Sequence, residues 1–490
     1  MTKFNSRSTG TKAVNKAGGP AFTETPELEL ALTALTTFVE GKFYESKEDF
    51  LDRIVSLCEK VDGSFLANLA VYARREANMR SISHVLLAEL ARLHKGQKDA
   101  ILAGLVRMDD MAEILAYYGF KYGKPIPNSL KKAFAKRIQF ADSYQLGKYK
   151  MEGKDVKLVD LFNLVHPKPL TQEQDHTWAK LLKGELESPE TWEVLISTAK
   201  TTEEAKQRWE ALIRENKLGY MAMLRNLRNF DKYQVSQEVQ QLVFNKLTNP
   251  EEVKRSKQLP FRFLSAYKNA PSTIYKDAVS IALDHAVDNM PRFDGQTAVF
   301  VDVSGSMKNP ISSKSEMTCA EIGLLFGLAL WKGNPNTTQF VTFDTGLYGF
   351  NFSSRTPLVD LIKSVPVQGG GTSTHLTFDY LTQEKKVVDQ VFILSDNMGY
   401  GGNVNSSFER YKREVNPNVK LYAIDLQGYG TLQFPQNNAF HVGGWSEKIF
   451  DVIKTLNSDK NALVNTIKNY EIPAPKMASS EDLGSESQED

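Results

Sequence analysis

A group of oxygen-bearing side chains follows an apolar run in the sequence VFVDVSGSM, residues 299–307. Asp302, Ser304 and Ser306 stand two residues apart, so a chain that leaves a buried strand and turns tightly can aim all three at one place. One carboxylate and two hydroxyls are hard oxygen ligands, which suit a magnesium ion with near-octahedral coordination. The spacing therefore predicts part of a metal site.

Two more oxygen ligands occur where later strands are expected to end. Thr372 lies in VQGGGTSTH and Asp396 lies in FILSDNMG. Ligands of open parallel sheets bind beyond the carboxyl ends of the strands, so these residues join Asp302, Ser304 and Ser306 in the predicted ligand set. Clusters of Asp, Ser and Gly after strands also form plain turns that bond their own backbone. We favour a magnesium site because the oxygen ligands recur at separate strand ends.

A catalytic alternative makes Asp302 the phosphoaspartate nucleophile of a magnesium phosphohydrolase. That chemistry needs an acid two residues later to protonate the leaving oxygen, and Ser304 occupies this position. His375 follows closely but has no suitably spaced nucleophile, and GYGGN at 399–403 lacks the lysine and hydroxyl of a phosphate-binding loop. We therefore predict a binding site and no enzyme.

The elements that position these residues change in type near residue 290. From residue 297 onward, short β-branched and aromatic runs alternate with helix-like segments, which predicts a parallel sheet with helices on both faces. From Thr25 to about Asp288, apolar residues recur at helical spacing without strand alternation. Many helices with short links predict stacked antiparallel pairs, a HEAT-like α-solenoid. The predicted fold class is α followed by α/β.

The densest basic and aromatic stretch lies in the helical half. In NSLKKAFAKRIQF, Lys132 and Lys136 are expected to point away from an apolar face and toward phosphates. The same stretch contains Lys131, Arg137, Tyr144, Lys148, Tyr149, Lys150 and Lys154. Lysines neutralise phosphates and exposed rings stack on bases, but the residues alone slightly favour a solvated helix face with its tyrosines in the core.

Other basic residues are open to two interpretations. Arg74, Arg75 and Arg80 in YARREANMRS either contact RNA or pair with acids such as Glu76. His166 precedes a proline, so it can end a helix.

Composition limits the classes of protein that remain. The chain has 490 residues, which predicts two or three domains, and no apolar run reaches the ~18 to 20 residues of a membrane span. The first residues do not resemble a secretory signal, so we expect a cytoplasmic protein. Cys58 and Cys319 are expected to be buried, reduced thiols. The net charge of +1 leaves RNA binding open, because basic residues can gather on one face.

The motifs DVSGSM, GGGTS and LSDNM, in this order on a βαβ pattern, resemble the metal-ion-dependent adhesion site of von Willebrand factor A domains. This resemblance implies that the five ligands named above hold the ion directly or through water. It also implies that one coordination position stays open for a carboxylate from an acidic protein ligand. Asn397 stands where that family commonly has glycine, which alters the turn but removes no ligand.

The helical half resembles the TROVE module of the Ro autoantigen family in NKAGGPAF, LAVYARREANMRS, GKYKMEGKDVKLVDLFNLVHPKP and MLRNLRNF. The resemblance covers residues 15–465. It implies a helical ring closed by the A domain, with single-stranded ends of misfolded RNAs in the ring and small structured Y RNAs on its outer surface. The family's RNA-contacting lysine and histidine correspond to Lys148 and His166, with Lys150 beside them, while Glu152 replaces the family's arginine.

The predicted domains are a disordered basic N-terminus at 1–20, the TROVE helical repeats at 21–289, the A domain at 290–470 and a disordered acidic tail at 471–490. The predicted function is that of a monomeric RNA-binding ribonucleoprotein component in RNA stabilisation and quality control, with an exoribonuclease tethered through RNA as a partner. The alternative is a protein-interaction module that uses its magnesium site and has no RNA function.

Overall fold

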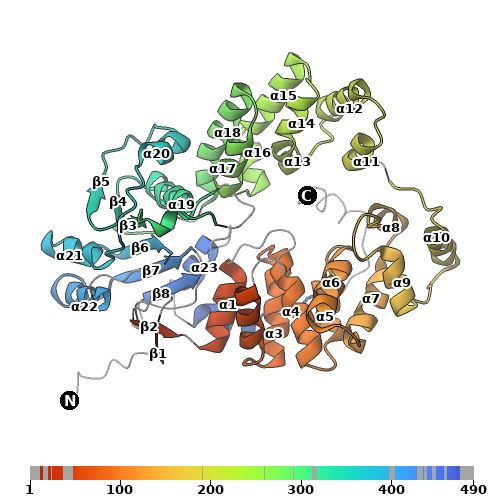
Figure 1. Ribbon diagram of the computed structural model, residues 1–490, viewed down its shortest axis with the longest axis horizontal. Helices are drawn as coiled ribbons and strands as arrows, with labels where there is room; N and C mark the ends of the chain where they lie inside the picture. The colour runs from red at the N-terminus through yellow and green to blue at the C-terminus, as the bar shows by residue number, and fades with distance from the viewer. Residues whose placement is uncertain are drawn as a thin grey trace. The chain divides into compact units, whose positions relative to one another are not determined.

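The computed structural model describes most of the chain (Figure 1). The described residues are 11–14, 20–23, 25–36, 48–189, 191–258, 260–290, 292–311, 317–396, 403–426, 434, 439–443, 449–456 and 461–474. They divide into two compact units. The sheet unit comprises residues 1–38, 224–231 and 240–463, and the helical unit comprises 39–223, 232–239 and 464–490.

Helices make up the first half of the chain after a short hairpin. The hairpin strands are β1 Thr11–Val14 and β2 Pro20–Thr23. The first helices are α1 Pro26–Thr36, α2 Glu48–Cys58, α3 Gly63–Arg75, α4 Arg80–Leu93, α5 Lys98–Gly104, α6 Asp110–Tyr122, α7 Asn128–Phe140, α8 Ser143–Lys148 and α9 Leu158–Val165. They continue with α10 Gln172–Leu182, α11 Trp192–Ser197, α12 Thr202–Arg214, α13 Tyr220–Arg225, α14 Leu227–Lys232, α15 Gln237–Leu247, α16 Pro250–Ser256, α17 Pro260–Asn269, α18 Thr273–Ala286 and the 3₁₀ turn η2 Val287–Asn289.

Strands and helices alternate in the second half. The strands are β3 Thr297–Asp302, β4 Thr338–Phe343, β5 Leu347–Gly349, β6 Gln390–Ser395, β7 Lys420–Asp425 and β8 Ala439–Gly443. The helices are η3 Ser306–Lys308, α19 Cys319–Gly333, α20 Leu358–Ser364, α21 His375–Gln383, α22 Val404–Glu414, α23 Ile449–Leu456 and α24 Ala462–Lys468.

The sheet has the strand order β5-β4-β3-β6-β7-β8, and every pair is parallel except β4 with β5. From β3 the chain first adds β4 on one side and later adds β6 on the other. The carboxyl ends of β3 and β6 therefore form a topological switch point, which is where open α/β sheets bind ligands. Asp302 ends β3 and Asp396 directly follows β6.

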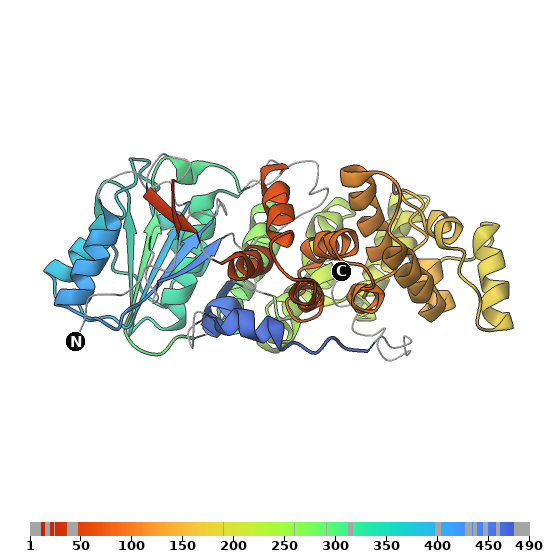
Figure 2. The same cartoon turned by 90° about the horizontal axis from the view of Figure 1, so that it is seen from below.

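The two faces of the sheet carry different helices, with α19 on one side and α21 and α22 on the other (Figures 1 and 2). Two glycines bring α19 close to β3, because a Cβ atom at Gly323 or Gly327 would lie 3.1 or 2.6 Å from a methyl group of Val301. Alternate β3 residues turn to the other face, where Phe300 joins Phe378 of α21 and Phe408 of α22 in one buried cluster. The strand is thus buried on both faces, as its continuous apolar sequence predicts.

Several helices from the predicted helical domain belong to the sheet unit, among them α17 and α18. Lys268 of α17 contacts both carboxylate oxygens of Glu321 on α19 at 2.9 Å. Asp284 of α18 accepts a hydrogen bond from Leu358 N at 3.0 Å and pairs with Lys332 at 2.9 Å. These contacts explain why the compact units cross the expected boundary at residue 290.

In the helical unit, helices pack on the next helix and on the next but one, with α3 on α4, and α7 on α5 and α9. Asp62 begins α3 by accepting hydrogen bonds from the Ser64 and Phe65 backbone amides, both at 2.9 Å. The Ser64 hydroxyl, which donates to the same carboxylate, and these amides lower the pKa of Asp62. Between residues 25 and 290 the described chain contains helices and no strand. The predicted fold class, stacked helices followed by an α/β domain, is confirmed.

Several smaller predictions can be checked in the same way. Cys58 and Cys319 are free and buried, as predicted. No helix among the described residues is long and apolar enough to cross a membrane. Residues 11–14 correct the prediction of a disordered N-terminus, because they pair with residues 20–23 in an antiparallel ladder.

Candidate functional sites

The carboxyl edge of the central strands gathers the predicted metal ligands of the first motif. The Asp302 side chain is fully buried, and its Oδ1 accepts a hydrogen bond from Ser304 N at 2.8 Å. The hydroxyls of Ser304 and Ser306 lie 3.3 Å apart. The tight turn after β3 therefore brings the carboxylate and both hydroxyls together, as the alternating sequence predicts.

Backbone hydrogen bonds join this turn to the glycine loop that carries Thr372. Gly305 N donates to Gly370 O, and Gly369 N donates to Val303 O, both at 2.9 Å. Gly369 has φ of +87°, a left-handed conformation that glycine adopts without strain. The loop of Thr372 thus lies against the turn of Asp302 and its serines.

Asp344, directly after β4, is a structural residue of this edge that the sequence did not single out. Its carboxylate accepts hydrogen bonds from Gly346 N at 3.0 Å, the Tyr348 hydroxyl at 3.0 Å and Gly370 N at 3.1 Å. Burial raises the pKa of Asp344, but these donors outweigh that effect and keep the pKa below its usual value. Asp344 therefore fixes the glycine loop beside the ligands.

The electrostatics of Asp302 fit a cation at this edge. Burial raises the pKa of Asp302 to about 6, and the negative charge of Asp396 adds to the rise. Hydrogen bonds from Ser395 Oγ to Oδ2 at 2.7 Å and from Ser304 oppose this rise without cancelling it. Asp396 is itself 2% exposed. A buried carboxylate is costly without a compensating charge, and a divalent ion supplies that charge.

The five predicted ligands fit a hard ion that takes oxygen donors. No group of three or more His, Cys, Asp or Glu side chains suited to a metal occurs in the described part of the chain. The donor set instead combines two carboxylates with three hydroxyls, the chemistry that magnesium prefers. Ser395 is an additional partner, since it orients the Asp302 carboxylate from the neighbouring strand. His375 opens α21, while 399–402 lie outside the described residues.

A second candidate site lies in the helical unit, where α7 exposes Lys132 and Lys136 as predicted. The Lys136 ammonium lies 4.9 Å from the centre of the Phe140 ring. Arg137 is different, because its side chain is 7% exposed and its guanidinium donates to Leu105 O, Val106 O and Gln145 Oε1 at 2.9 to 3.3 Å. Arg137 therefore links helices, which corrects its predicted contact with RNA.

Several basic and aromatic residues after α7 already have contacts within the protein. Lys148 is half-buried in the last turn of α8, and its ammonium lies 5.5 Å from the centre of the Tyr149 ring. Tyr149 is 6% exposed, so it packs in the core and cannot stack on a base. Lys150 donates to Leu186 O, and Lys154 pairs with Glu113 at 2.7 Å. These two lysines already have partners, which corrects the expectation that Lys150 faces RNA.

His166 ends α9 in a left-handed conformation with φ of 45° and ψ of 60°, and its side chain is exposed. Gln139 of α7 donates to Lys168 O at 2.8 Å, so the segment that carries His166 is tied to the end of α7. We call the exposed side chains of Lys132, Lys136, His166 and Lys168 the α7–α9 edge. Among the described residues, none of the four forms an ion pair.

Arg74 and Arg80 belong to a buried charge cluster around Asp110. The Asp110 side chain is fully buried. Its Oδ2 lies 3.4 Å from Arg74 Nη2, and its Oδ1 lies 2.9 Å from both Arg80 Nε and His84 Nε2. Burial raises the pKa of Asp110, but Arg74, His84 and Arg80 together hold it well below its usual range. Arg75 is exposed, but its Nε donates to Ala103 O at 2.7 Å. The predicted RNA contacts of Arg74 and Arg80 are therefore corrected to ion pairs with an aspartate of another helix.

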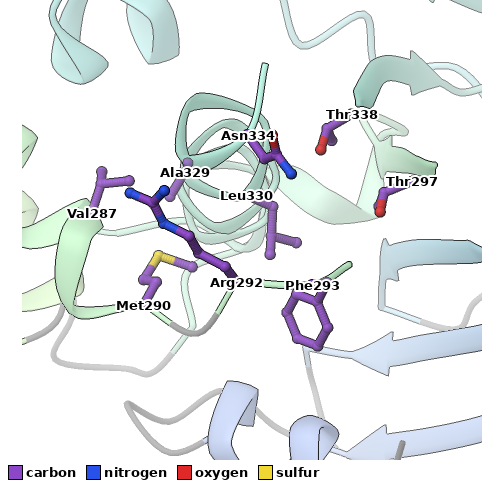
Figure 3. A pocket seen from close by; sticks show the side chains of 10 residues that line it. Val287, Met290, Arg292, Phe293, Thr297, Ala329, Leu330, Asn334 and Thr338 are labelled. Carbon is purple, nitrogen blue, oxygen red and sulfur yellow. The ribbon is translucent and has the colours of Figure 1, made fainter. Parts of the chain in front are cut away.

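A small cavity of about 20 Å³ lies at the opposite ends of the strands from Asp302 (Figure 3). Thr297 and Thr338, which begin β3 and β4, form one side, and Leu330 of α19 lies between them and the segment that precedes the sheet. Arg292 at its rim pairs with Asp288 at 3.3 Å. The lining is mostly apolar and holds no group of the predicted sites.

Family models match both halves of the chain. The model described as TROVE domain matches residues 178–282, and the model described as Ro60 vWA domain matches residues 296–456. Together the two segments make up more than half of the chain. The first segment begins after His166, so the α7–α9 edge lies outside it.

Known proteins share parts of the sequence and the fold. Telomerase protein component 1 of Rattus norvegicus is 23% identical over 303 residues, which cover 44% of this chain and 11% of that protein. The protein of the same name from Mus musculus is 42% identical over 82 residues, or 17% of this chain and 3% of that protein. The chain thus spans about a tenth or less of the curated relatives it matches. The crystal structure of Deinococcus radiodurans RO (RSR) protein has a TM-score of 0.63 and 17% identity, and the match covers 91% of this chain and all of that one, which shows a shared fold.

Proposed function

This chain belongs to the Ro family of TROVE-domain proteins, and from that premise we propose that it is the RNA-binding subunit of a ribonucleoprotein. The observation that carries the proposal is the α7–α9 edge. Lys132 and Lys136 on α7 and His166 and Lys168 after α9 are exposed, and no ion pair within the described residues neutralises the three lysines. Such cations remain available to phosphates.

Binding at this edge is mainly electrostatic. If three or four of these side chains each neutralise one phosphate of single-stranded RNA, the logarithm of the affinity falls with the logarithm of salt at a slope of roughly −2 to −3. Between about 50 and 200 mM salt the affinity then drops roughly 20- to 50-fold. A flat salt profile contradicts the proposal.

The RNAs themselves are part of the proposal. We propose small structured Y-like RNAs and the single-stranded ends of misfolded RNAs as ligands, in RNA stabilisation and quality control in the cytoplasm. The protein acts as a monomer, and an exoribonuclease reaches it through the bound RNA. The resemblance at Lys148 and His166 supports this choice, although Glu152 replaces the family's arginine in the same stretch.

The carboxyl edge of the sheet has a separate role in this proposal. Asp302, Ser304, Ser306, Thr372 and Asp396 hold a magnesium ion, which supplies a positive charge that an acidic protein ligand can bind. Asp344 holds the glycine loop in place, and Ser395 orients Asp302. Among the described residues of this edge, none is placed as a nucleophile with a partnered acid, and we infer a binding role. This edge also favours the second candidate function, a protein-interaction module without RNA.

Replacing Lys148 and His166 together by alanine tests the RNA assignment. We expect RNA affinity about tenfold or more weaker, since the lysine loses a charge-assisted contact and the histidine loses a hydrogen-bonding one, with an unchanged thermal unfolding temperature. The control replaces Lys95, which precedes α5, and Lys98, which begins it; both are exposed, and the change leaves the affinity within about twofold. Equal affinities of the two double variants refute the site. A protein that carries no nucleic acid at low salt and binds none supports the protein-interaction function instead.

A further inference from the structure

The outward face of α8 offers an aromatic ring beside a lysine. The opposite face is anchored, because Gln145 is 1% exposed and bonds Arg137 of α7, and Leu146 is also 1% exposed. Asp142 caps the helix by accepting a hydrogen bond from Gln145 N at 2.7 Å. This anchoring leaves Tyr144 and Lys148 on the other side, four residues apart and so adjacent on the helix surface.

Tyr144 is the exposed tyrosine of this helix. Its side chain is 39% exposed, and it forms no hydrogen bond or ring contact with another described residue. Tyr149, the other tyrosine of the segment, is 6% exposed and faces Arg107 at 5.3 Å. An aromatic ring that is partly exposed on a fixed helix is available for stacking, which a buried ring is not.

We propose that this face binds one unpaired nucleotide of RNA, with the base stacked on Tyr144 and a neighbouring phosphate paired with Lys148. The proposal rests on the RNA-binding function and adds the kind of RNA that this helix selects. In an A-form duplex the faces of the bases are covered by their neighbours, so only an unstacked base can lie on a side chain. The α8 face therefore selects single-stranded segments, loops or ends over continuous duplex.

The test uses two probes of equal length: a short oligouridine, and an abasic ribose-phosphate oligomer that keeps the phosphates but has no bases. Tyr144→Ala weakens oligouridine binding roughly 5- to 150-fold and leaves binding of the abasic oligomer within about twofold. Tyr144→Phe keeps the ring and the wild-type affinity. Lys148→Ala weakens both probes, because it removes a phosphate contact. Phe120→Ala, at a 58% exposed ring of α6, is the matched control and changes neither.

Three outcomes overturn the inference. If Tyr144→Ala leaves oligouridine affinity unchanged, no base stacks there. If it weakens both probes equally, the tyrosine supports the backbone contact instead of a base. If Tyr144→Phe loses as much oligouridine affinity as Tyr144→Ala, the hydroxyl and not the ring makes the contact with RNA. When the wild-type protein binds neither probe at low salt, the RNA-binding function itself fails, which separates that failure from loss of the Tyr144 contact alone.

Discussion

Replacing Asp110 by asparagine should destabilise the helical unit by several kcal/mol. The substitution keeps the size of the side chain but removes the one charge that Arg74, Arg80 and His84 share. Arg74 is 3% exposed, so its guanidinium would remain buried without a carboxylate. Breaking a buried ion pair by removing one partner costs about 3 to 5 kcal/mol.

The neighbouring Asp109 moderates this cost. It pairs with Arg80 at 2.7 Å and with Arg107 at 3.1 Å, so Arg80 keeps one partner when Asp110 is neutralised. We therefore expect a loss near the lower limit, about 3 kcal/mol, which corresponds to a fall of roughly 6 to 12 °C in the unfolding temperature of a unit of this size. Differential scanning calorimetry of the full chain measures this shift.

The pH dependence gives an independent check. The pKa of Asp110 in the folded protein lies well below the unfolded value of 3.8, so its contribution is fully present above pH 4 and is lost as the pH falls through the folded pKa. The deficit of Asp110→Asn is thus present at pH 7 and narrows below about pH 4. Asp52→Asn is the matched control, because Asp52 is 64% exposed and its pair with Lys121 is worth about 1 kcal/mol or less. Equal unfolding temperatures for the two variants refute the assignment.

Two further predictions concern the sheet unit and its metal edge. Asp302→Asn should lower the affinity for manganese or magnesium, measured by calorimetry, more than Ser395→Ala does. Ser395→Ala removes a partner that orients a ligand, and such a loss lowers metal affinity roughly 10- to 100-fold. An effect of Asp302→Asn that is equal to or smaller than that of Ser395→Ala contradicts the ligand set. Gly327→Ala should lower the unfolding temperature, since its Cβ would lie 2.6 Å from a Val301 methyl group, whereas Gly119→Ala on α6 meets no atom within 4 Å and should stabilise by about 1 kcal/mol. The opposite order of these two glycine variants refutes the packing argument.

The sheet could be predicted from the sequence because its strands are buried on both faces. A fully buried strand requires a continuous apolar run, and β3, β6 and β7 each have one of four residues, whereas polar residues interrupt β4. The metal ligands could then be predicted from the sheet, since the carboxyl ends of parallel strands meet at one edge. The three-residue strand β5 could not be predicted, because Leu347–Gly349 at the sheet edge is too short for a periodic signal.

The roles of the arginines could not be predicted, because they depend on partners from other helices. Arg74 meets Asp110 from 36 residues away, and Arg137 meets Leu105 O from 32 residues away. Helical spacing shows which face of its own helix a residue occupies, but not which carboxylate or carbonyl the next helix presents. Asp344 was missed for the same reason, since the amide of Gly370 that it holds is 26 residues away. The exposed lysines of α7 were easier, because a wholly apolar face at Leu130, Phe134 and Ile138 determines where Lys132 and Lys136 point.

The two candidate sites differ in the source of their positive charge, and an experiment can therefore distinguish their roles. The metal edge belongs to the sheet unit and needs a cation before it can attract an anionic ligand, whereas the α7–α9 edge belongs to the helical unit and is already positive. Removing divalent ions with EDTA at constant ionic strength should therefore leave the affinity for an unstructured single-stranded RNA within about twofold, because the cations that neutralise its phosphates are side chains. Asp302→Asn should behave in the same way. A tenfold loss in either experiment would place an RNA phosphate at the metal edge and would refute the division of roles between the two units.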